Sequence, residues 1–452
     1  MIEEQQIAPE LNVGDDHVFN FRKYAWGQFK KNKPAYWSYR ILVILAVIAL
    51  LSPFLATDQP WYCKYKGVTM FPAFSFSNSC EVVDESGNKE TIQYDIAEWK
   101  RMDLSSVVFA PIPYAANKSD YANADYVSPS GKQVFIDKDG NEQPMPWRFK
   151  HWLGTNKGGE DVLSGLVNGT RISLTIGLIS MAIASLIGIV LGAMAGYYGD
   201  RRLKTTRGSF WTMVLGLILA YYYGFSLRAY DITDGFGTSS FAMLKELFIS
   251  VLIFVLVAYV FYRLGKLVGK ISFLSAQVFI PVDSIVSRAI EILISMPLLI
   301  LIISISAITK EKSMINLMII IGLTTWTGIA RLTRAEFLRI SDLEYIHAAR
   351  SMGFKEFRVI FRHALPNGLA PALVAIAFGV ASAILIESSL SFLGIGVPPS
   401  TVTWGSLLSA GREQFSAWWL VIFPGLAIFV TVTVYNLLGE GLRDALDPRL
   451  KR

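Results

Sequence analysis

Only a few residues of this chain have types and spacings that could support chemistry, and none completes a catalytic or metal-binding pattern. The segment GKLVGKIS (265–272) is similar to a phosphate-binding loop, but it has one residue too few between its glycines and Ile271 where Ser or Thr must reach magnesium. In DKDGNE (137–142), Gly140 is the fourth residue rather than the sixth, and no bidentate glutamate follows at the offset of a calcium loop. We predict no enzyme activity and no bound cofactor or metal, so any ATP used for work is hydrolysed by another chain. No metal-ligand spacing relates the four histidines, His17, His151, His347 and His363.

One polar segment is a candidate for a different kind of function, because it interrupts two long apolar runs. EYIHAARSMGFKEFRVIFRHALPN (344–367) lies between the apolar residues 314–330 and 368–386. It is helix-prone, amphipathic and basic, and it carries no constellation for enzyme chemistry. We interpret it as a segment that docks into a groove of a partner; an ordinary solvated loop is the alternative.

The small residues of this segment support docking. Ala348 and Ala349 permit the close approach of another surface, and Gly353 predicts a turn. FKEFRVIF then predicts a second helical piece, with its phenylalanines near one face. Pro366 fixes the entry to the next apolar run, because proline is well tolerated in the first turn of a helix. We expect a short helix–turn–helix that lies along a membrane surface.

The composition identifies the environment of these elements. Of the 452 residues, 52% are hydrophobic and 17% are charged, whereas soluble domains average about 25% charged residues. The apolar residues are clustered in runs of roughly 20, the length that crosses a hydrocarbon core of about 30 Å. The net charge of +6 is therefore no evidence for nucleic acid by itself. The sequence predicts an all-α polytopic membrane protein.

Eight apolar runs are candidate spans. The third is the weakest, because it is short and rich in tyrosine. The first begins about forty residues into the chain without a small-residue cleavage site after it, so it predicts an uncleaved anchor and not a secretory signal. The expected spans are residues 39–57, 171–197, 210–226, 244–262, 286–308, 314–333, 368–388 and 417–438.

Basic residues predict the orientation of these spans, because short basic loops stay in the cytoplasm. Lys and Arg are concentrated before the first span, after the second, fourth and sixth spans, and after the eighth. The loop ITKEKS, with its two lysines, lies on the other side but is outweighed. Both termini and the segment 344–367 are therefore expected in the cytoplasm.

Residues 58–168 then form an extracytoplasmic domain. CEVVDESGNKETIQY and YVSPSGKQVFIDKDGNEQ each place a Gly-containing turn between β-prone runs, which predicts a small antiparallel meander. The only two cysteines, Cys63 and Cys80, lie here, on the side where oxidation occurs. We predict a disulfide between them, which would contribute about 3 kcal/mol; two free thiols are the alternative.

The polar segment resembles the coupling motif of bacterial ABC-importer permeases. That motif is Glu-Ala-Ala, three residues, Gly, nine residues, Ile, one residue, Leu-Pro. Two residues depart from it, since a histidine replaces both its Glu and its Ile; this departure concerns those two side chains and not the element as a whole. This sequence keeps every spacing, in His347-Ala348-Ala349, Gly353 and His363-Ala364-Leu365-Pro366. Further similarity to the C-type permease subunits of oligopeptide and dipeptide importers lies in residues 151–177, 387–413 and 423–450.

The resemblance covers the N-terminal anchor and residues 151–200 and 283–452, and it implies a six-span permease core. The spans within 201–282 look inserted into that core, and lipid-facing packing is the default role for them. The expected layout is a cytoplasmic segment with an interfacial helix (1–38), the first anchor (39–57), the extracytoplasmic domain (58–168), a core span (169–200), the inserted hairpin (201–282), and the remaining core (283–452) with a coupling loop at 342–366.

The resemblance implies an importer subunit that moves oligopeptides or dipeptides across the bacterial cytoplasmic (inner) membrane by alternating access. Implied partners are a second permease subunit in a heterodimer, two cytoplasmic ATPase subunits that use ATP and magnesium, an extracytoplasmic binding protein and membrane lipid, without nucleic acid. The same class carrying a nickel chelate, glutathione or another small solute is the alternative. Arg350 and Arg358 are expected to pair with the ATPase or to lie on the surface rim. The implied coupling residues are Tyr345, His347, Ala348, Ala349, Arg350, Gly353, Arg358, Leu365 and Pro366.

The translocation pathway is expected among polar residues inside the spans, because such residues usually face the bundle interior. Pro297 and Pro424 are expected to kink their helices. Two other classes remain as alternatives: a membrane-anchored enzyme or sensor, and an ion-coupled secondary transporter. The first would need paired carboxylates or a nucleophile in 58–168, and the second would need charges at mid-span and inverted repeats. The candidate pathway residues are Thr175, Ser180, Glu387, Ser388 and Ser389.

Overall fold

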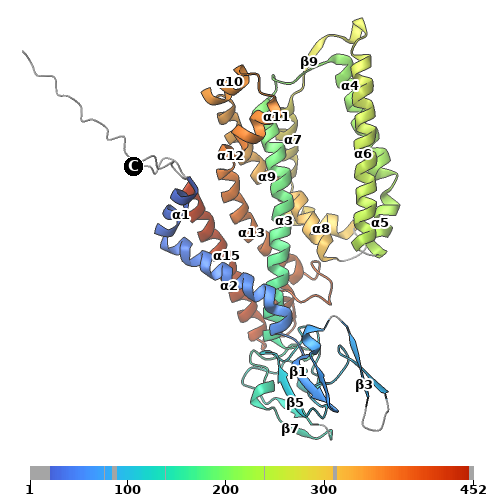
Figure 1. Cartoon of the computed structure of the whole chain (residues 1–452), viewed down its shortest axis with the longest axis vertical. Helices are drawn as coiled ribbons and strands as arrows, with labels where there is room; N and C mark the ends of the chain where they lie inside the picture. Colours follow the sequence, from blue (N-terminus) through green and yellow to red (C-terminus); the bar gives the residue numbers. More distant parts are fainter. Residues whose placement is uncertain are drawn as a thin grey trace, which may run out of the picture.

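The computed structural model describes residues 21–75, 77–83, 89–137, 139–238, 240–308 and 313–446. It is a bundle of long helices with a small strand-containing domain at one end (Figure 1). Seven of the described helices are long and apolar enough to cross a membrane, and a bent pair of helices makes eight if it counts as one span. The prediction of an all-α polytopic chain with a small β-containing domain is confirmed. His17 and most of the loop ITKEKS lie outside the described residues.

The core is built on two helices that lie along each other, α3 (Val162–Tyr198) and α9 (Met314–Ser341). Three glycines spaced four residues apart line α3 on this side. A β-carbon would lie 2.8 Å from the carbonyl oxygen of Trp326 at Gly188 and 2.5 Å from that of Ala330 at Gly192, and at Gly196 it would overlap the carbonyl of Arg334. Helix backbones approach this closely only across small residues, so the GxxxGxxxG pattern sets the α3–α9 contact.

Five further helices surround this pair. α13 packs against α3, α9 and α15, and α2 packs against α3 and α15. Asn32 links the two ends of the chain, because its side chain caps α2 by accepting from the Ala35 N–H at 3.2 Å and donates to Asp444 Oδ2 at 3.0 Å. Pro424 lies inside α15, which continues through it. The bounds are α1 (Phe21–Lys31), α2 (Lys33–Leu55), α13 (Ala370–Phe392), α14 (Trp404–Glu413) and α15 (Trp419–Leu446).

The predicted span 286–308 is not one helix. It is broken into α7 (Val282–Ser295) and α8 (Leu298–Ile308), which are bent by 87°. Met296, before the proline, has the extended backbone angles φ −92° and ψ 133°, as expected of a residue that precedes proline. The kink predicted at Pro297 is confirmed, and Figure 1 shows that it directs α8 away from the core toward the hairpin of α5 and α6.

The segment 201–282 forms a helical hairpin that stands apart from the core, with α4 and α6 against each other (Figure 1). Its two ends are joined by a short antiparallel pairing of β8 and β9. Only 6% of the most apolar stretch of α6 is buried in this chain, which favours a lipid-facing role. The elements are β8 (Lys204–Thr206), α4 (Arg207–Tyr221), the π-helix η4 (Tyr222–Ser226), α5 (Ala229–Thr238), α6 (Ser240–Val268), the 3₁₀ helix η5 (Ser272–Leu274) and β9 (Gln277–Phe279).

Residues 56–161, which we call the strand domain, separate α2 from α3. Both predicted hairpins are present, but the described strands form three separate sheets and not one meander. Because α3 begins at Val162, the domain ends before the predicted residue 168. The sheets are β2–β1–β5, β3–β4 and β6–β7, from β1 (Pro60–Tyr65), β2 (Val68–Met70), β3 (Ser79–Val83), β4 (Lys89–Gln93), β5 (Ser106–Phe109), β6 (Val134–Ile136) and β7 (Glu142–Pro144), with 3₁₀ helices η1 (Pro72–Phe74), η2 (Tyr121–Asn123) and η3 (Trp147–Phe149).

Candidate functional site

The predicted coupling loop forms a compact set of short helices at the end of the bundle opposite the strand domain (Figure 1). α10 (Glu344–Ser351) follows α9, and the turn after it contains Gly353, whose φ of +77° is a left-handed conformation that other residues rarely adopt. The Gly353 N–H donates to the Arg350 carbonyl at 2.9 Å. No described atom lies within 4 Å of where its β-carbon would stand, so the glycine is required for its backbone angles and not for space.

α10 has a buried face and an exposed face. Ile346 and Ala349 are 0% and 2% exposed and belong to a buried cluster with residues of α3 and α9. Tyr345, His347 and Ala348 are exposed on the other face. Of the two alanines, therefore, only Ala348 is available to another protein, and the close approach that Ala349 permits is to its own chain.

The second helical piece is continuous from α11 (Glu356–Arg358) through the π-helix η6 (Val359–Ala364) to α12 (Leu365–Gly368). Its phenylalanines do not share one face. Phe357 and Phe361 are 71% and 51% exposed, with ring centroids 4.4 Å apart, whereas Phe354 is half-buried and stacks on His363. Arg358 is exposed, with its guanidinium over the Phe354 ring.

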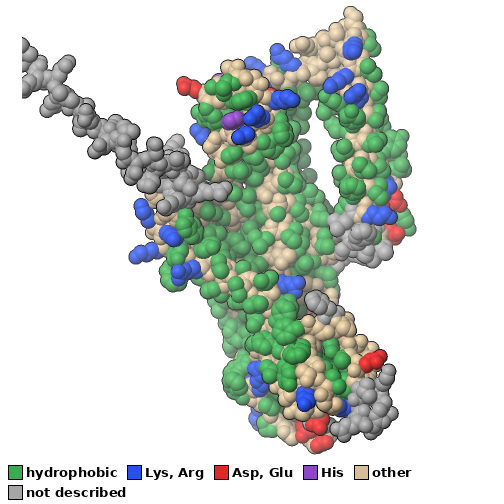
Figure 2. Space-filling model, in the orientation of Figure 1, with side chains coloured by type: hydrophobic (Ala, Val, Ile, Leu, Met, Phe, Trp, Pro, Cys, Tyr) green, Lys and Arg blue, Asp and Glu red, His purple; other side chains and the backbone are tan. Residues whose placement is uncertain are grey.

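Pro366 lies in the first turn of α12, as predicted. Leu365 is half-buried against the cluster of α10. Figure 2 shows hydrophobic side chains beside Lys, Arg and His at this end of the molecule. The arrangement is a partly apolar surface with a basic rim, as expected of the predicted docking face.

A polar clamp, which we define as Tyr197, Arg350 and Glu356, fastens this docking face to the end of α3. The buried Tyr197 hydroxyl hydrogen-bonds the Glu356 carboxylate and accepts from Arg350 Nε at 3.3 Å. Arg350 Nε is also 3.6 Å from Glu356 Oε1, and its guanidinium lies over the Tyr197 ring. Arg350 is therefore paired within its own chain, while Arg358 is the arginine that remains exposed. A second ion pair, Arg202 with Asp342 at 2.9 Å, supports the same junction.

The candidate pathway residues do not form one group. Glu387 is 0% exposed, and its carboxylate accepts from Ser173 at 3.2 Å and Ser391 at 2.7 Å. Ser388 and Ser180 are buried too, whereas Thr175 and Ser389 donate to backbone carbonyls of their own helices. Since Glu387 is enclosed by α3, α13 and their serines, the structure favours a packing role for it over a pathway role.

Sequence reasoning missed a buried ionic group in the strand domain. His151 is 0% exposed, with Nδ1 2.8 Å from Asp161 Oδ2 and Nε2 3.2 Å from Asp120 Oδ2. Burial alone would lower the pKa of His151, but the hydrogen bonds to Asp120 and Asp161 outweigh it and raise the pKa above its usual value. Asp161 also caps α3 by accepting from the Ser164 N–H at 2.6 Å. His151 thus ties the strand domain to the first turn of α3.

The two cysteines are free thiols in this structure, the alternative that the sequence left open. Both lie in the apolar core of the strand domain, Cys63 on β1 and Cys80 on β3. Burial, and next the neighbouring Cys80, raise the pKa of the Cys63 thiol to about 11, so it is unreactive at neutral pH. Among the residues that the structure describes, no group of three or more His, Cys, Asp or Glu side chains is placed to hold a metal ion.

Comparison with known proteins agrees with this architecture. Residues 270–452 match the family described as the binding-protein-dependent transport system inner membrane component, and residues 20–67 match the N-terminal transmembrane domain of oligopeptide transport permease C. The chain is 28% identical over 429 residues to the inner membrane ABC transporter permease protein YejE of Escherichia coli (strain K12), covering 94% of this chain and 96% of the relative.

Two other relatives extend the comparison. The glutathione transport system permease protein GsiD of Pectobacterium atrosepticum is 30% identical over 330 residues, covering 73% of this chain and 82% of the relative. The dipeptide transport system permease protein DppC of Bacillus subtilis is 28% identical over 313 residues, covering 69% and 72%. The chain therefore belongs to the inner-membrane permeases of binding-protein-dependent ABC importers, within their peptide and dipeptide group.

Proposed function

We propose that this chain pairs with a second permease subunit and that the exposed face of α10 docks into a cytoplasmic ATPase subunit. The observation that carries the proposal is the surface beside Gly353, where small and apolar side chains are exposed on a helix that is itself fastened to the core. A loop that merely joined two spans would need neither the buried face of α10 nor the polar clamp.

The clamp gives this docking face a route into the membrane core. α10 packs against α3 and α9 through Ile346 and Ala349, and Tyr197 fixes its far end. α3 and α9 have 37 and 28 residues, long enough to cross the bilayer, and their backbones are in contact. A displacement imposed on α10 by ATP-driven closure is therefore passed to the membrane helices, and ATP supplies the free-energy difference between the inward-open and outward-open states.

We propose that the cargo is a short peptide, as for the dipeptide permease among the relatives. A second candidate is glutathione or another small solute, which is supported by the similarity to a glutathione permease. We further propose that the strand domain lies outside the inner membrane and that both termini lie in the cytoplasm, as the basic loops predict. An extracytoplasmic binding protein would then deliver the cargo on the strand-domain side.

Uptake into proteoliposomes tests this function. The chain is reconstituted with its partner permease, the ATPase subunits and the binding protein, and entry of labelled trialanine or glutathione is followed with and without ATP. We expect ATP-dependent entry of trialanine, and loss of entry in Gly353→Pro. Entry of glutathione alone would select the second candidate, and entry without the ATPase subunits would contradict the importer.

Cysteine labelling tests the orientation. In a Cys63→Ser, Cys80→Ser background, a membrane-impermeant maleimide added outside should modify Tyr121→Cys in the strand domain and not Phe357→Cys. Both side chains are well exposed, at 84% and 71%, so a difference in labelling reports the side of the membrane and not burial. The reverse pattern would invert the proposed topology.

A further inference from the structure

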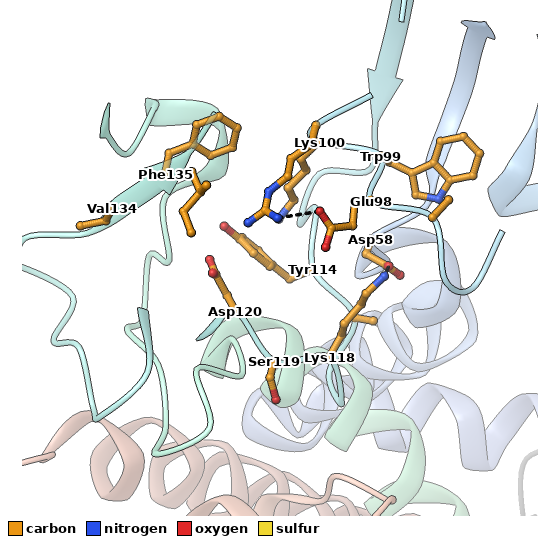
Figure 3. Close-up of a pocket in the computed structure, with 14 residues that line it drawn as sticks. Asp58, Glu98, Trp99, Lys100, Tyr114, Lys118, Ser119, Asp120, Val134 and Phe135 are labelled. Carbon is orange, nitrogen blue, oxygen red and sulfur yellow. Dashed lines mark hydrogen bonds and ion pairs between the residues drawn. The ribbon is translucent and has the colours of Figure 1, made fainter. Parts of the chain in front are cut away.

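The strand domain contains a polar pocket that is separate from the coupling loop. Its volume is about 130 Å³, and it is lined by Asp58 and by residues of three segments: 97–101, 114–120 and strand β6. Figure 3 shows the Tyr114 ring in the middle of the pocket, between Asp120 and the pair of Asp58 and Lys118. Its ionisable lining is balanced, with Lys100, Arg101 and Lys118 facing Asp58, Glu98 and Asp120.

Lys100 differs from the other two cations. Lys118 Nζ is 2.5 Å from Asp58 Oδ2, and Arg101 is 2.7 Å from Glu98 Oε2. The Lys100 ammonium instead lies 3.1 Å from the centroid of the Tyr114 ring, and no hydrogen bond or ion pair joins it to any residue that the structure describes. It is a half-buried cation, and the N–H donors on the side away from the Tyr114 ring can serve a ligand.

Asp120 presents the opposite charge to the same pocket. Its Oδ2 atom accepts from the Asn123 amide at 2.9 Å and lies 3.2 Å from His151 Nε2. Its Oδ1 atom has no hydrogen bond with the described residues, and Figure 3 shows the carboxylate directed into the pocket beside Tyr114. One carboxylate oxygen thus contacts side chains of the strand domain itself, and the other can accept a hydrogen bond from a ligand.

The remaining wall is apolar. Val134, Phe135 and Ile136 of β6 line it. A water molecule needs about 10–15 Å³ of such space, so a cavity of about 130 Å³ has room for roughly ten non-hydrogen atoms. That is the size of one leucine-like amino acid.

We propose that this pocket binds a small zwitterion of the α-amino-acid type, with its carboxylate on Lys100, its ammonium on Asp120 and its apolar part against β6. A simple anion would leave the free oxygen of Asp120 unpaired and repelled, and a simple cation would be repelled by Lys100. A zwitterion satisfies both groups and adds no net charge to a partly buried site. The site lies in the strand domain, apart from the coupling loop.

The protonation of Lys100 gives the binding a pH dependence. Burial lowers the pKa of Lys100 to about 7, and the positive charge of Lys118 lowers it further. The carboxylates of Asp120, Asp161 and Asp58 act in the opposite direction and raise this pKa, but burial outweighs them. The ammonium that receives the carboxylate is therefore present below about pH 7 and is lost as the pH rises through that value. Binding should weaken over the same interval.

The test uses the full chain in lipid nanodiscs and tritiated L-leucine as the probe, at pH 6 and at pH 8.5. We expect saturable binding at pH 6 that is weaker at pH 8.5. Lys100→Met should weaken it about 10- to 100-fold, the effect of losing one charged hydrogen bond. The matched control is Lys64→Met, an exposed lysine on β1 that is outside the pocket, and it should bind as the unchanged chain does.

Competition on the unchanged chain keeps the test independent of folding. 4-Methylpentanoate has the carboxylate without the ammonium, and 3-methylbutylamine has the ammonium without the carboxylate. Each should compete at least about tenfold more weakly than leucine. Equal competition by either analogue, equal binding in Lys100→Met, or no saturable leucine binding at pH 6 would overturn the proposal.

Discussion

Removing one hydroxyl from the polar clamp should loosen the docking face without unfolding the protein. In Tyr197→Phe the ring stays in its buried place, but the hydrogen bonds to Glu356 and Arg350 are lost. A hydrogen bond to a charged group contributes about 1.5–3 kcal/mol. Because the Glu356 side chain is 51% exposed, water replaces part of this bond, and we expect a loss of about 1–2 kcal/mol. That corresponds to a 5- to 30-fold larger population of undocked loop.

The assay compares transport and ATP hydrolysis in the reconstituted importer. We expect Tyr197→Phe to lower the number of substrate molecules moved per ATP several-fold while the unfolding temperature changes little. Tyr198→Phe is the matched control, because that neighbouring tyrosine is half-buried and its hydroxyl makes no hydrogen bond to the described residues. Unchanged coupling in Tyr197→Phe, or an equal loss in Tyr198→Phe, would refute the clamp.

Three further predictions concern the junctions of the fold. The raised pKa of His151 means that its ion pairs stabilise the fold fully below its unfolded pKa and are lost as the pH rises through the higher folded value. Thermal unfolding should therefore show stability that falls as the pH rises from about 6.5, and His151→Gln should remove this slope. Gly353→Ala should destabilise the turn after α10 by about 1 kcal/mol or more, because alanine is strained at the positive φ of this position. Faster amide exchange in the loop would show this. Gly328→Ala is the control and should have no such effect, because no described atom lies within 4 Å of its β-carbon position. Gly192→Leu should abolish folded protein in the membrane, since its β-carbon alone would lie 2.5 Å from the Ala330 carbonyl; normal yield of that variant would show that the helices can separate.

Features encoded by a few neighbouring residues could be predicted from the sequence. Run length and hydropathy predicted the spans, and the Gly-containing turns predicted the hairpins β3–β4 and β6–β7. Gly353 predicted a turn because the left-handed φ of such a turn depends only on the backbone of the glycine itself. Pro297 likewise predicted a kink. The 87° bend could not be predicted, because its size depends on how α8 packs beyond the proline.

Features that depend on distant partners could not be predicted. His151 meets Asp120, 31 residues away, only because the strand domain folds back on the start of α3. Ser173 and Glu387 are 214 residues apart, and their hydrogen bond joins α3 to α13 only in the folded chain. Arg350 was expected to pair with the ATPase or to lie on the surface rim, and its hydrogen bond to Tyr197, 153 residues away, could not be foreseen. Charge alone does not say which face of a short helix is covered.

Crosslinking from α10 tests the central claim most directly, which is that its exposed face docks into an ATPase subunit. Single cysteines are placed at Ala348, which is exposed, and at Ala349, which is 2% exposed, and the assembled importer is treated with a thiol-to-amine crosslinker. We predict that Ala348→Cys joins this chain to the ATPase, with a yield that changes when ATP binds, and that Ala349→Cys does not. An assembled, ATP-hydrolysing importer that gives no crosslink from position 348, or an equal crosslink from position 349, would contradict the claim.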